Sequence, residues 1–230
     1  MATLYIVSTP IGNLEDLSLR ALRILKEVDL ILSEDTRITK KLLAHYQIKT
    51  PTLSYHQYSR LKKVNYILDL LGQGKNLALV SDAGTPGISD PGNKLIQEVI
   101  HYFERSSKIT ELKIIPIPGP SAVTAAASIS GFAMDKFIFM GFPPTKKKRK
   151  KFFEEIAKAK YSVIFYESPY RILKTLKELS SLIGSREIVV CRELTKKFET
   201  IYRGKIDEVI KEIEKSQIKG EFVVIVEGKK

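Results

Sequence analysis

Short, uninterrupted apolar runs alternate along the chain with segments of helical spacing, and this pattern constrains the fold more than any other feature. Runs such as "NLALV", "SVIFYE", "EIVVC" and "FVVIVEG" are rich in β-branched residues and do not alternate apolar with polar positions. Such runs are typical of strands covered on both faces. Between the runs, "LRALRILKEV" and "NKLIQEVIHYF" space their apolar residues as amphipathic helices do. The sequence therefore predicts an α/β architecture, with mainly parallel or mixed sheets flanked by helices.

A change of domain is predicted near the middle of the chain. The stretch "PIPGPSA", residues 116–122, combines three prolines with a glycine, which makes a stiff crossing between two α/β halves. We expect an N-terminal domain of residues 1–118 and a C-terminal domain of residues 119–230. In the second half, "FETIYRG" predicts an additional antiparallel strand.

Size and cysteine content narrow the class of protein. With 230 residues, 43% of them apolar, the chain is long enough to bury one large core or two modest ones. Cys191 is the single cysteine, so no internal disulfide is expected. The first residues lack a basic leader, and no apolar run approaches the roughly 20 residues of a membrane span. We expect a cytoplasmic protein.

The charge balance favours an anionic partner. Lys and Arg number 38 against 26 Asp and Glu, a formal net charge of +12. Nucleic acid is the commonest partner of such a surface, although a generally basic, lysine-rich composition explains the excess equally well. The densest run is "KKKRKK": Lys146, Lys147, Lys148, Arg149, Lys150 and Lys151. This run is expected either to contact phosphates, with salt-dependent affinity, or simply to form the solvated start of a helix.

The segment "VSDAGTPGISDPG", residues 80–92, is too long for an ordinary turn. A connection from strand to helix needs only about 2–6 residues, yet this segment follows the apolar run "NLALV" directly. Gly84 and Gly87 allow a ligand to approach the main chain, and Pro86 limits the entropy lost on binding. Open α/β sheets bind ligands at the carboxyl ends of their strands. We therefore expect a ligand-binding loop, with a covering loop as the alternative.

Other segments also follow predicted strands: "STPIGNLEDLSLRAL", "SEDTR", "FYESPYR" and "CRELTKKFE". In "SEDTR", Glu34, Asp35 and Arg37 are expected to form a local salt-bridge set or to contact substrate. The dinucleotide pattern G-x-G-x-x-G and the phosphate loop G-x-x-x-x-G-K-[ST] do not occur. The three histidines show no spacing typical of metal ligands, so no metal is expected.

Taken together, the motifs resemble those of the tetrapyrrole-methylase superfamily of S-adenosylmethionine-dependent methyltransferases. The segments that carry the resemblance span nearly the whole chain: "TPIGNLEDLSLRAL", "DLILSEDTR", "SYHQ", "VSDAGTPGISDPG", "PGPSA", "FMGFPP", "FYESPYR", "RELTKKFE" and "KGEFVVIVEG". Within the superfamily, they are most similar to members that methylate the ribose 2′-hydroxyl of a cytidine in 16S ribosomal RNA. The resemblance implies two α/β domains with S-adenosylmethionine in the cleft between them, a homodimer, no metal, and the 30S subunit as partner.

The resemblance also implies roles for individual residues. Those expected near the cofactor are Ile11, Gly84, Thr85, Ile88, Ser121, Ala122, Tyr166 and Glu221. Glu167 and Asp82 are the candidates for the general base, since each follows a strand, and Asp35 and Arg37 are expected to orient the nucleotide. The basic run 146–151 is expected to hold RNA phosphates.

Two other functions remain as alternatives. One is a methyltransferase acting on a tetrapyrrole or corrinoid precursor, whose carboxylates a basic surface also suits. That substrate does not require six adjacent basic residues. The other is a catalytically idle RNA-binding module, which the presence of all the cofactor-loop motifs disfavours.

Overall fold

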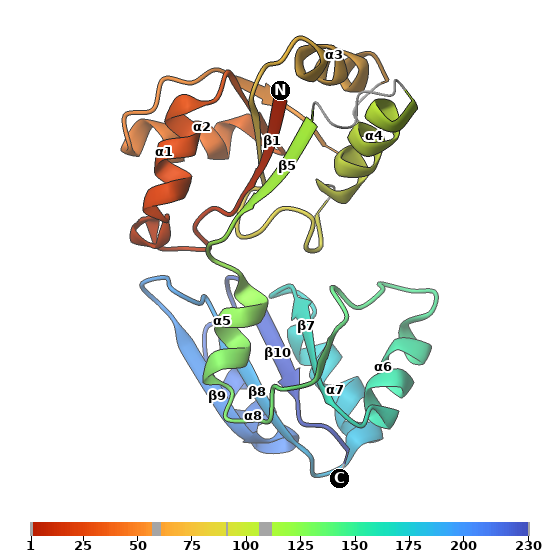
Figure 1. Ribbon diagram of the computed structural model, residues 1–230. Coiled ribbons are helices and arrows are strands. Elements are labelled where there is room, and N and C mark those ends of the chain that lie inside the picture. The colour runs from red at the N-terminus through yellow and green to blue at the C-terminus, as the bar shows by residue number, and fades with distance from the viewer. Residues whose placement is uncertain (1, 57–60, 91, 106–111, 230) are drawn as a thin grey trace. The chain divides into compact units, whose positions relative to one another are not determined.

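The computed structural model describes residues 2–56, 61–90, 92–105 and 112–229 (Figure 1). Gln57 and Pro91, which belong to two of the motifs quoted above, lie outside these ranges. The chain divides into two compact units, Met1–Ser121 and Ala122–Lys230. In the part of the chain that is described, no helix is long and apolar enough to cross a membrane.

The N-terminal unit is built on a parallel five-stranded sheet of order β3-β2-β4-β1-β5. Its strands are β1 (Ala2–Val7), β2 (Leu30–Ser33), β3 (Thr52–Ser54), β4 (Leu77–Val80) and β5 (Leu112–Ile117). β4 is the central strand, and all four of its residues are buried. Its continuous apolar run is what a strand covered on both faces requires. The prediction of a mainly parallel α/β sheet is confirmed here.

Helices cover both faces of this sheet. α1 (Leu19–Glu27) and α2 (Thr36–His45) share a buried apolar cluster with one face, and α3 (Leu61–Gly72) and α4 (Gly92–Arg105) share another with the opposite face (Figure 1). A short 3₁₀ helix, η1 (Leu14–Asp16), precedes α1. The neighbouring strands β1 and β4 therefore send their chains to helices on opposite faces. Such a switch point is where doubly wound sheets place ligands.

The C-terminal unit has a mixed five-stranded sheet of order β6-β7-β10-β8-β9. Its strands are β6 (Phe137–Phe139), β7 (Ser162–Glu167), β8 (Glu187–Arg192), β9 (Thr200–Lys205) and β10 (Phe222–Val226). β6 and β7 are parallel, and the other pairs are antiparallel. The extra antiparallel strand predicted in "FETIYRG" is confirmed as β9.

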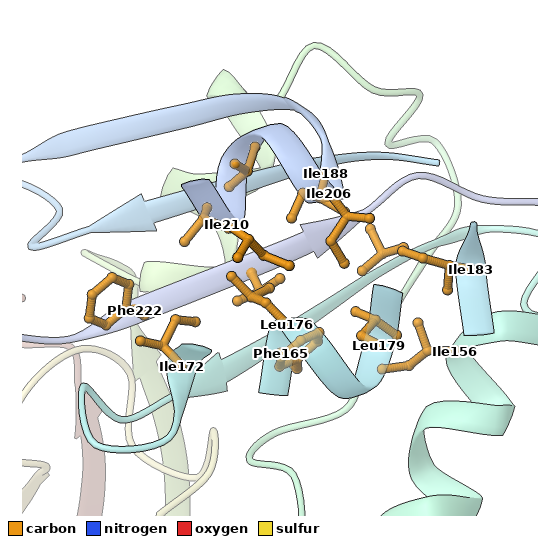
Figure 2. Close-up of a cluster of buried hydrophobic side chains, with 14 of the residues drawn as sticks. Ile156, Phe165, Ile172, Leu176, Leu179, Ile183, Ile188, Ile206, Ile210 and Phe222 are labelled. Atoms are coloured by element: carbon orange, nitrogen blue, oxygen red, sulfur yellow. The ribbon is translucent and has the colours of Figure 1, made fainter. Parts of the chain in front are cut away.

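The core of the C-terminal unit lies between the sheet and three helices: α6 (Arg149–Lys158), α7 (Ile172–Ile183) and α8 (Ile206–Glu214). Figure 2 shows apolar side chains of α7 and α8, such as Leu176 and Ile210, converging with Phe165 and Phe222 from the sheet. Val223 and Ile225 of β10 are buried outside this cluster, as the two-residue period of a strand requires. α5 (Ala122–Ile129) packs against β10 and β7.

Candidate active site

The loops that follow β1 and β4 are joined by main-chain hydrogen bonds. The N–H of Thr9 donates to the carbonyl of Gly84 at 2.9 Å, and the N–H of Gly84 donates back to the carbonyl of Thr9 at 3.0 Å. The hydroxyls of Ser8 and Thr85 lie 2.9 Å apart within hydrogen-bond distance. The long glycine-rich loop is therefore bound to the first loop at the switch point of the sheet.

The segment after β5 joins the same cluster. The hydroxyl of Thr85 donates to the carbonyl of Pro120 at 3.1 Å, next to Ser121. A Cβ atom on Gly119 would lie 2.9 Å from the Cβ of Ser8, so only glycine permits this close approach. Three loops, from the neighbouring strands β4, β1 and β5, thus meet at the carboxyl edge of the sheet, where α/β folds bind ligands.

Gly84 lies at the centre of this cluster in a left-handed conformation, with φ of +84°. A Cβ atom there would lie 3.4 Å from Cγ2 of Ile11 and 3.8 Å from the carbonyl oxygen of Pro120. The structure therefore brings Ile11, Gly84 and Thr85 together, three of the residues expected near the cofactor. Ile88, farther along the loop, is exposed.

The rest of the glycine-rich loop is braced by its own side chains. The Asp90 carboxylate accepts hydrogen bonds from the N–H groups of Gly87 at 2.6 Å and Gly92 at 2.8 Å. The Asn93 amide donates to the carbonyl of Gly87 at 2.7 Å. These bonds hold the loop before any ligand binds, which reduces the conformational entropy that binding must remove.

Asp35, Arg37 and Asp82 form a second group, at the carboxyl ends of the neighbouring strands β2 and β4. The Asp82 carboxylate accepts from the N–H of Asp35 at 2.9 Å. Asp35 caps α2 by accepting from the N–H of Arg37 at 2.8 Å, and it pairs with the exposed Arg37 guanidinium at 2.6 Å. The hydrogen bonds from Arg37 lower the pKa of Asp35 to about 2. Burial raises the pKa of Asp82.

Glu34, which precedes this group, is a carboxylate that the sequence did not single out as perturbed. It lines a small cavity with residues that include Tyr55, Ser81, Pro86 and Asp90. Burial raises the pKa of Glu34, and the negative charges of Asp82 and Asp90 raise it further. In sequence these carboxylates are far apart, so their mutual repulsion follows only from the parallel pairing of β2 with β4.

In the C-terminal unit, Tyr166 lies beside the start of α5. Burial raises the pKa of Tyr166 to about 12, a hydrogen bond with the main chain of Val123 opposes the rise, and the charge of Glu221 adds to it. Tyr166 is therefore a near neighbour of the first turn of α5, which begins at Ala122, and Glu221 is close enough to Tyr166 to act on its pKa. Glu221 is paired with Lys196 at 2.9 Å.

Glu167 has structural partners for both of its carboxylate oxygens. Its residue is 1% exposed. One oxygen accepts from the N–H of Ser168 at 2.8 Å and pairs with Arg171 at 2.8 Å. The other accepts from the hydroxyl of Thr175 at 2.6 Å. A general base must reach the proton that it removes. These contacts favour a structural role for Glu167 and leave Asp82 as the more accessible of the two expected bases.

Within the basic run, Arg149 differs from its neighbours. It is 8% exposed, and its guanidinium donates to Glu178 at 2.7 Å, to the Thr175 hydroxyl at 2.7 Å and to the carbonyl of Pro144 at 3.1 Å. Each guanidinium nitrogen therefore has a partner inside the protein, which favours a structural role for Arg149 over the expected phosphate contact. The other members are exposed: Lys146, Lys147, Lys148, Lys150 and Lys151.

Comparison with known proteins gives close relatives over the full length of the chain. It is 45% identical over 229 residues to "Ribosomal RNA small subunit methyltransferase I" of Thermotoga maritima, with 100% of both chains covered. Proteins of the same name from Bacillus subtilis and Vibrio cholerae are 45% and 47% identical. The matches cover 99% and 98% of this chain and 76% and 77% of those proteins.

Solved structures share the fold at low sequence identity. Diphthine synthase matches with a TM-score of 0.74 at 12% identity, covering 100% of this chain and 90% of the other. Cobalt precorrin-4 methyltransferase, a cobalamin biosynthetic enzyme, matches with a TM-score of 0.69 at 20% identity, covering 98% and 94%. The family model of the tetrapyrrole (corrin/porphyrin) methylases matches residues 3–210. With this match across both units, the chain belongs to the tetrapyrrole methylase family.

Proposed function

We propose that this chain is an S-adenosylmethionine-dependent methyltransferase that modifies the ribose 2′-hydroxyl of a cytidine in 16S ribosomal RNA. The observation that carries the proposal is the 45% identity, over the whole chain, to relatives named as ribosomal RNA small subunit methyltransferases. The proposal extends to action on the 30S subunit, in the cytoplasm, by a homodimer.

The residues of the glycine-rich loop fit the proposed cofactor. Gly84 presents main chain without a side chain beside the apolar Ile11, and the hydroxyl of Thr85 lies next to it. This combination of close main chain, apolar surface and hydroxyl suits the nucleoside and alkyl arm of S-adenosylmethionine. Ile88, exposed on the same loop, offers further apolar surface. When bound, the cofactor supplies a methyl group already activated by its sulfonium.

The C-terminal unit contributes its own expected contacts. Tyr166 lies near the first turn of α5, which begins at Ala122 directly after Ser121, and the charge of Glu221 acts on Tyr166. A helix start carries main-chain N–H groups without helical acceptors, and these favour carboxylate or other anionic groups. We propose that these residues bind a polar group of S-adenosylmethionine.

The protein's part in the chemistry is alignment and proton removal. Holding donor and acceptor in line is worth up to roughly 7–11 kcal/mol of the barrier. A ribose hydroxyl is a weak nucleophile, so a base that takes its proton as the new bond forms adds a factor of about 10²–10⁴. We assign this role to Asp82, whose raised pKa makes it a stronger base than an ordinary carboxylate. Asp35, which stays ionised, and the exposed Arg37 orient the nucleotide.

The test is methyl transfer from labelled S-adenosylmethionine to 30S subunits that lack the modification. Nucleoside digestion of the product is expected to yield 2′-O-methylcytidine, and mapping gives the position. A labelled base, or transfer only to a corrinoid or porphyrin precursor in a parallel reaction, would overturn the proposal. An Asp82→Asn variant that binds cofactor normally is expected to lose most of its rate.

A further inference from the structure

The loop that follows β6 is fastened to the end of the parallel strand β7 and to the turn after it. The N–H of Tyr166 donates to the carbonyl of Gly141 at 2.8 Å, and the rings of Phe142 and Tyr166 lie 5.3 Å apart, edge to face. The guanidinium of Arg171 donates to the carbonyl of Pro143 at 3.1 Å. Residues 141–143 are thus held against residues 166–171 at the carboxyl end of these strands.

A second arginine fixes the next residue of the first loop. Arg149 donates to the carbonyl of Pro144 at 3.1 Å, and its buried guanidinium is held in turn by Thr175 and Glu178. Two anchored arginines therefore bind two successive carbonyls. Beyond them, residues 145–148 are exposed. The three lysines of this stretch, Lys146 to Lys148, are consequently presented from a rigid support.

The segment that carries these lysines and the turn to which Arg171 joins it also expose two aromatic rings that the core does not use. Tyr170 is 95% exposed, at the tip of a tight turn in which the N–H of Arg171 donates to the carbonyl of Ser168 at 3.1 Å. Phe142 is 52% exposed although one edge packs on Tyr166. The Arg171–Pro143 hydrogen bond joins the immediate neighbours of these two aromatic residues.

We propose that Tyr170 and Phe142 stack on unpaired bases of the RNA whose phosphates contact Lys146, Lys147 and Lys148. Proteins that bind single strands combine a basic track with exposed aromatic rings, because every base has a face on which a ring can stack. A net charge of +12 favours this anionic partner over an apolar protein surface. The inference rests on the proposed function, since it names the RNA structure that the enzyme recognises.

The chain contains no tryptophan, so a substitution there creates a single reporter. We expect Tyr170→Trp to bind a fluorescently labelled, unstructured cytidine-rich RNA at least as tightly as the wild type, with quenching of its indole that saturates together with binding. Tyr66→Trp is the matched control, because Tyr66 is also exposed but lies on α3 of the other unit. Its indole is expected to remain unquenched.

Removal of the ring supplies the second measurement. We expect Tyr170→Ala to weaken RNA binding at least about fivefold, with an unchanged salt slope because no phosphate contact is lost. Its thermal shift with S-adenosylhomocysteine is expected to stay normal. Unchanged RNA affinity, or quenching by fully double-stranded RNA alone, would overturn the inference. So would a change in sedimentation instead of RNA affinity, which would make this surface a protein interface.

Failure of this inference is distinguishable from failure of the proposed function. If the wild type methylates 30S subunits and Tyr170→Ala does so equally well at limiting RNA, only the stacking inference is wrong. If the wild type transfers no methyl group to RNA but Tyr170→Ala still loses RNA affinity, the stacking inference stands and the proposed reaction is wrong.

Discussion

The hydroxyl of Thr175 lies between the carboxylate of Glu167 and the guanidinium of Arg149: it donates to the first at 2.6 Å and accepts from the second at 2.7 Å. All three residues are buried. A single hydroxyl on α7 therefore joins a buried carboxylate to a buried guanidinium. Arg149 also bonds to the loop after β6 through Pro144, and Glu167 pairs with Arg171 after β7, so the hydroxyl helps to hold both loops.

The first prediction concerns this hydroxyl. Thr175→Val keeps the shape of the side chain but leaves one hydrogen bond of each buried ion unmade. We expect it to lower the free energy of unfolding by about 3 kcal/mol, measured by urea denaturation. Thr175→Ser keeps the hydroxyl and removes one methyl group, so its cost is expected to be only about 1 kcal/mol. Equal losses in the two variants would show that packing, and not the hydrogen bonds, holds this position.

This network also shows where sequence reasoning ends. The strands were predictable because a buried strand needs a continuous apolar run, which is a local property of the chain. The side-chain partners of Arg149 lie 26 and 29 residues away, on a helix whose position depends on the whole core. Nothing in the local sequence shows that Arg149 is buried while the lysines beside it are exposed. Likewise, the place of Glu167 at the end of a strand predicts a general base, since the sequence does not reveal its contacts with Thr175 and Arg171.

In the glycine-rich loop, the sequence predicted a ligand-binding element but not its bracing. The "DAGTPGISDPG" composition indicates a loop with unusual main-chain angles, which is a local signal. The pairing of Thr9 with Gly84 joins residues 75 positions apart, and it depends on β1 and β4 being neighbours in the sheet. Strand order is a tertiary property that the periodicity of a sequence does not contain.

The second prediction tests Gly84 against a glycine with the same main-chain angle. Gly84 and Gly74 both have φ of +84°, but nothing lies within 4 Å of a Cβ placed on Gly74. Replacement of either by valine is expected to cost about 1–3 kcal/mol of stability through main-chain strain. Only Gly84→Val is expected to lose the rise in melting temperature that S-adenosylhomocysteine gives the wild type. Loss of the shift in Gly74→Val as well would attribute it to general destabilisation.

The third prediction is the pH dependence that Asp35 confers. The pKa of Asp35 falls from 3.8 to about 2 because Arg37 hydrogen-bonds to its ionised form. A carboxylate with a lowered pKa in the folded state stabilises the protein above its unfolded pKa, and the stabilisation disappears as pH falls toward the folded pKa.

We therefore expect the wild type to be more stable than Asp35→Asn by a constant amount above pH 5, and the difference to shrink between pH 4 and pH 2. Asparagine still caps the helix, so the cap is unchanged. Arg37→Gln removes the guanidinium but keeps the N–H that also bonds to Asp35, so it is expected to reduce the same pH-dependent part. Added salt is expected to weaken it as well. Urea denaturation at several pH values measures the free energy of unfolding of the wild type and of the two variants. A difference that persists unchanged at pH 2 would contradict the ion pair.

The fourth prediction concerns Cys191, which is fully buried in β8. Burial raises the pKa of its thiol to about 12, so almost none is present as the reactive thiolate at neutral pH. We expect labelling by a thiol-specific disulfide reagent to be at least about a thousandfold slower than in guanidinium chloride, because it must wait for unfolding. As the chain has one cysteine, the rate then reports unfolding directly. Fast labelling in native buffer would mean that β8 opens independently.

The last prediction separates a specific phosphate contact from general basicity. Lys146, Lys147 and Lys148 are exposed together on the loop that Arg149 anchors. Replacement of all three by alanine is expected to weaken RNA binding and to reduce the slope of log affinity against log salt by about 0.7 for each lost phosphate contact.

The matched control replaces Lys211 of α8 and the two lysines that flank this helix, Lys205 and Lys215, all of which are also exposed. The two triple variants have the same net charge, so general attraction to a polyanion falls equally in both. A reduced slope in the first variant alone, with unchanged binding of S-adenosylhomocysteine, would assign the RNA contact to the loop. Equal slopes in the two variants would mean that the lysines act only through the overall charge of the protein.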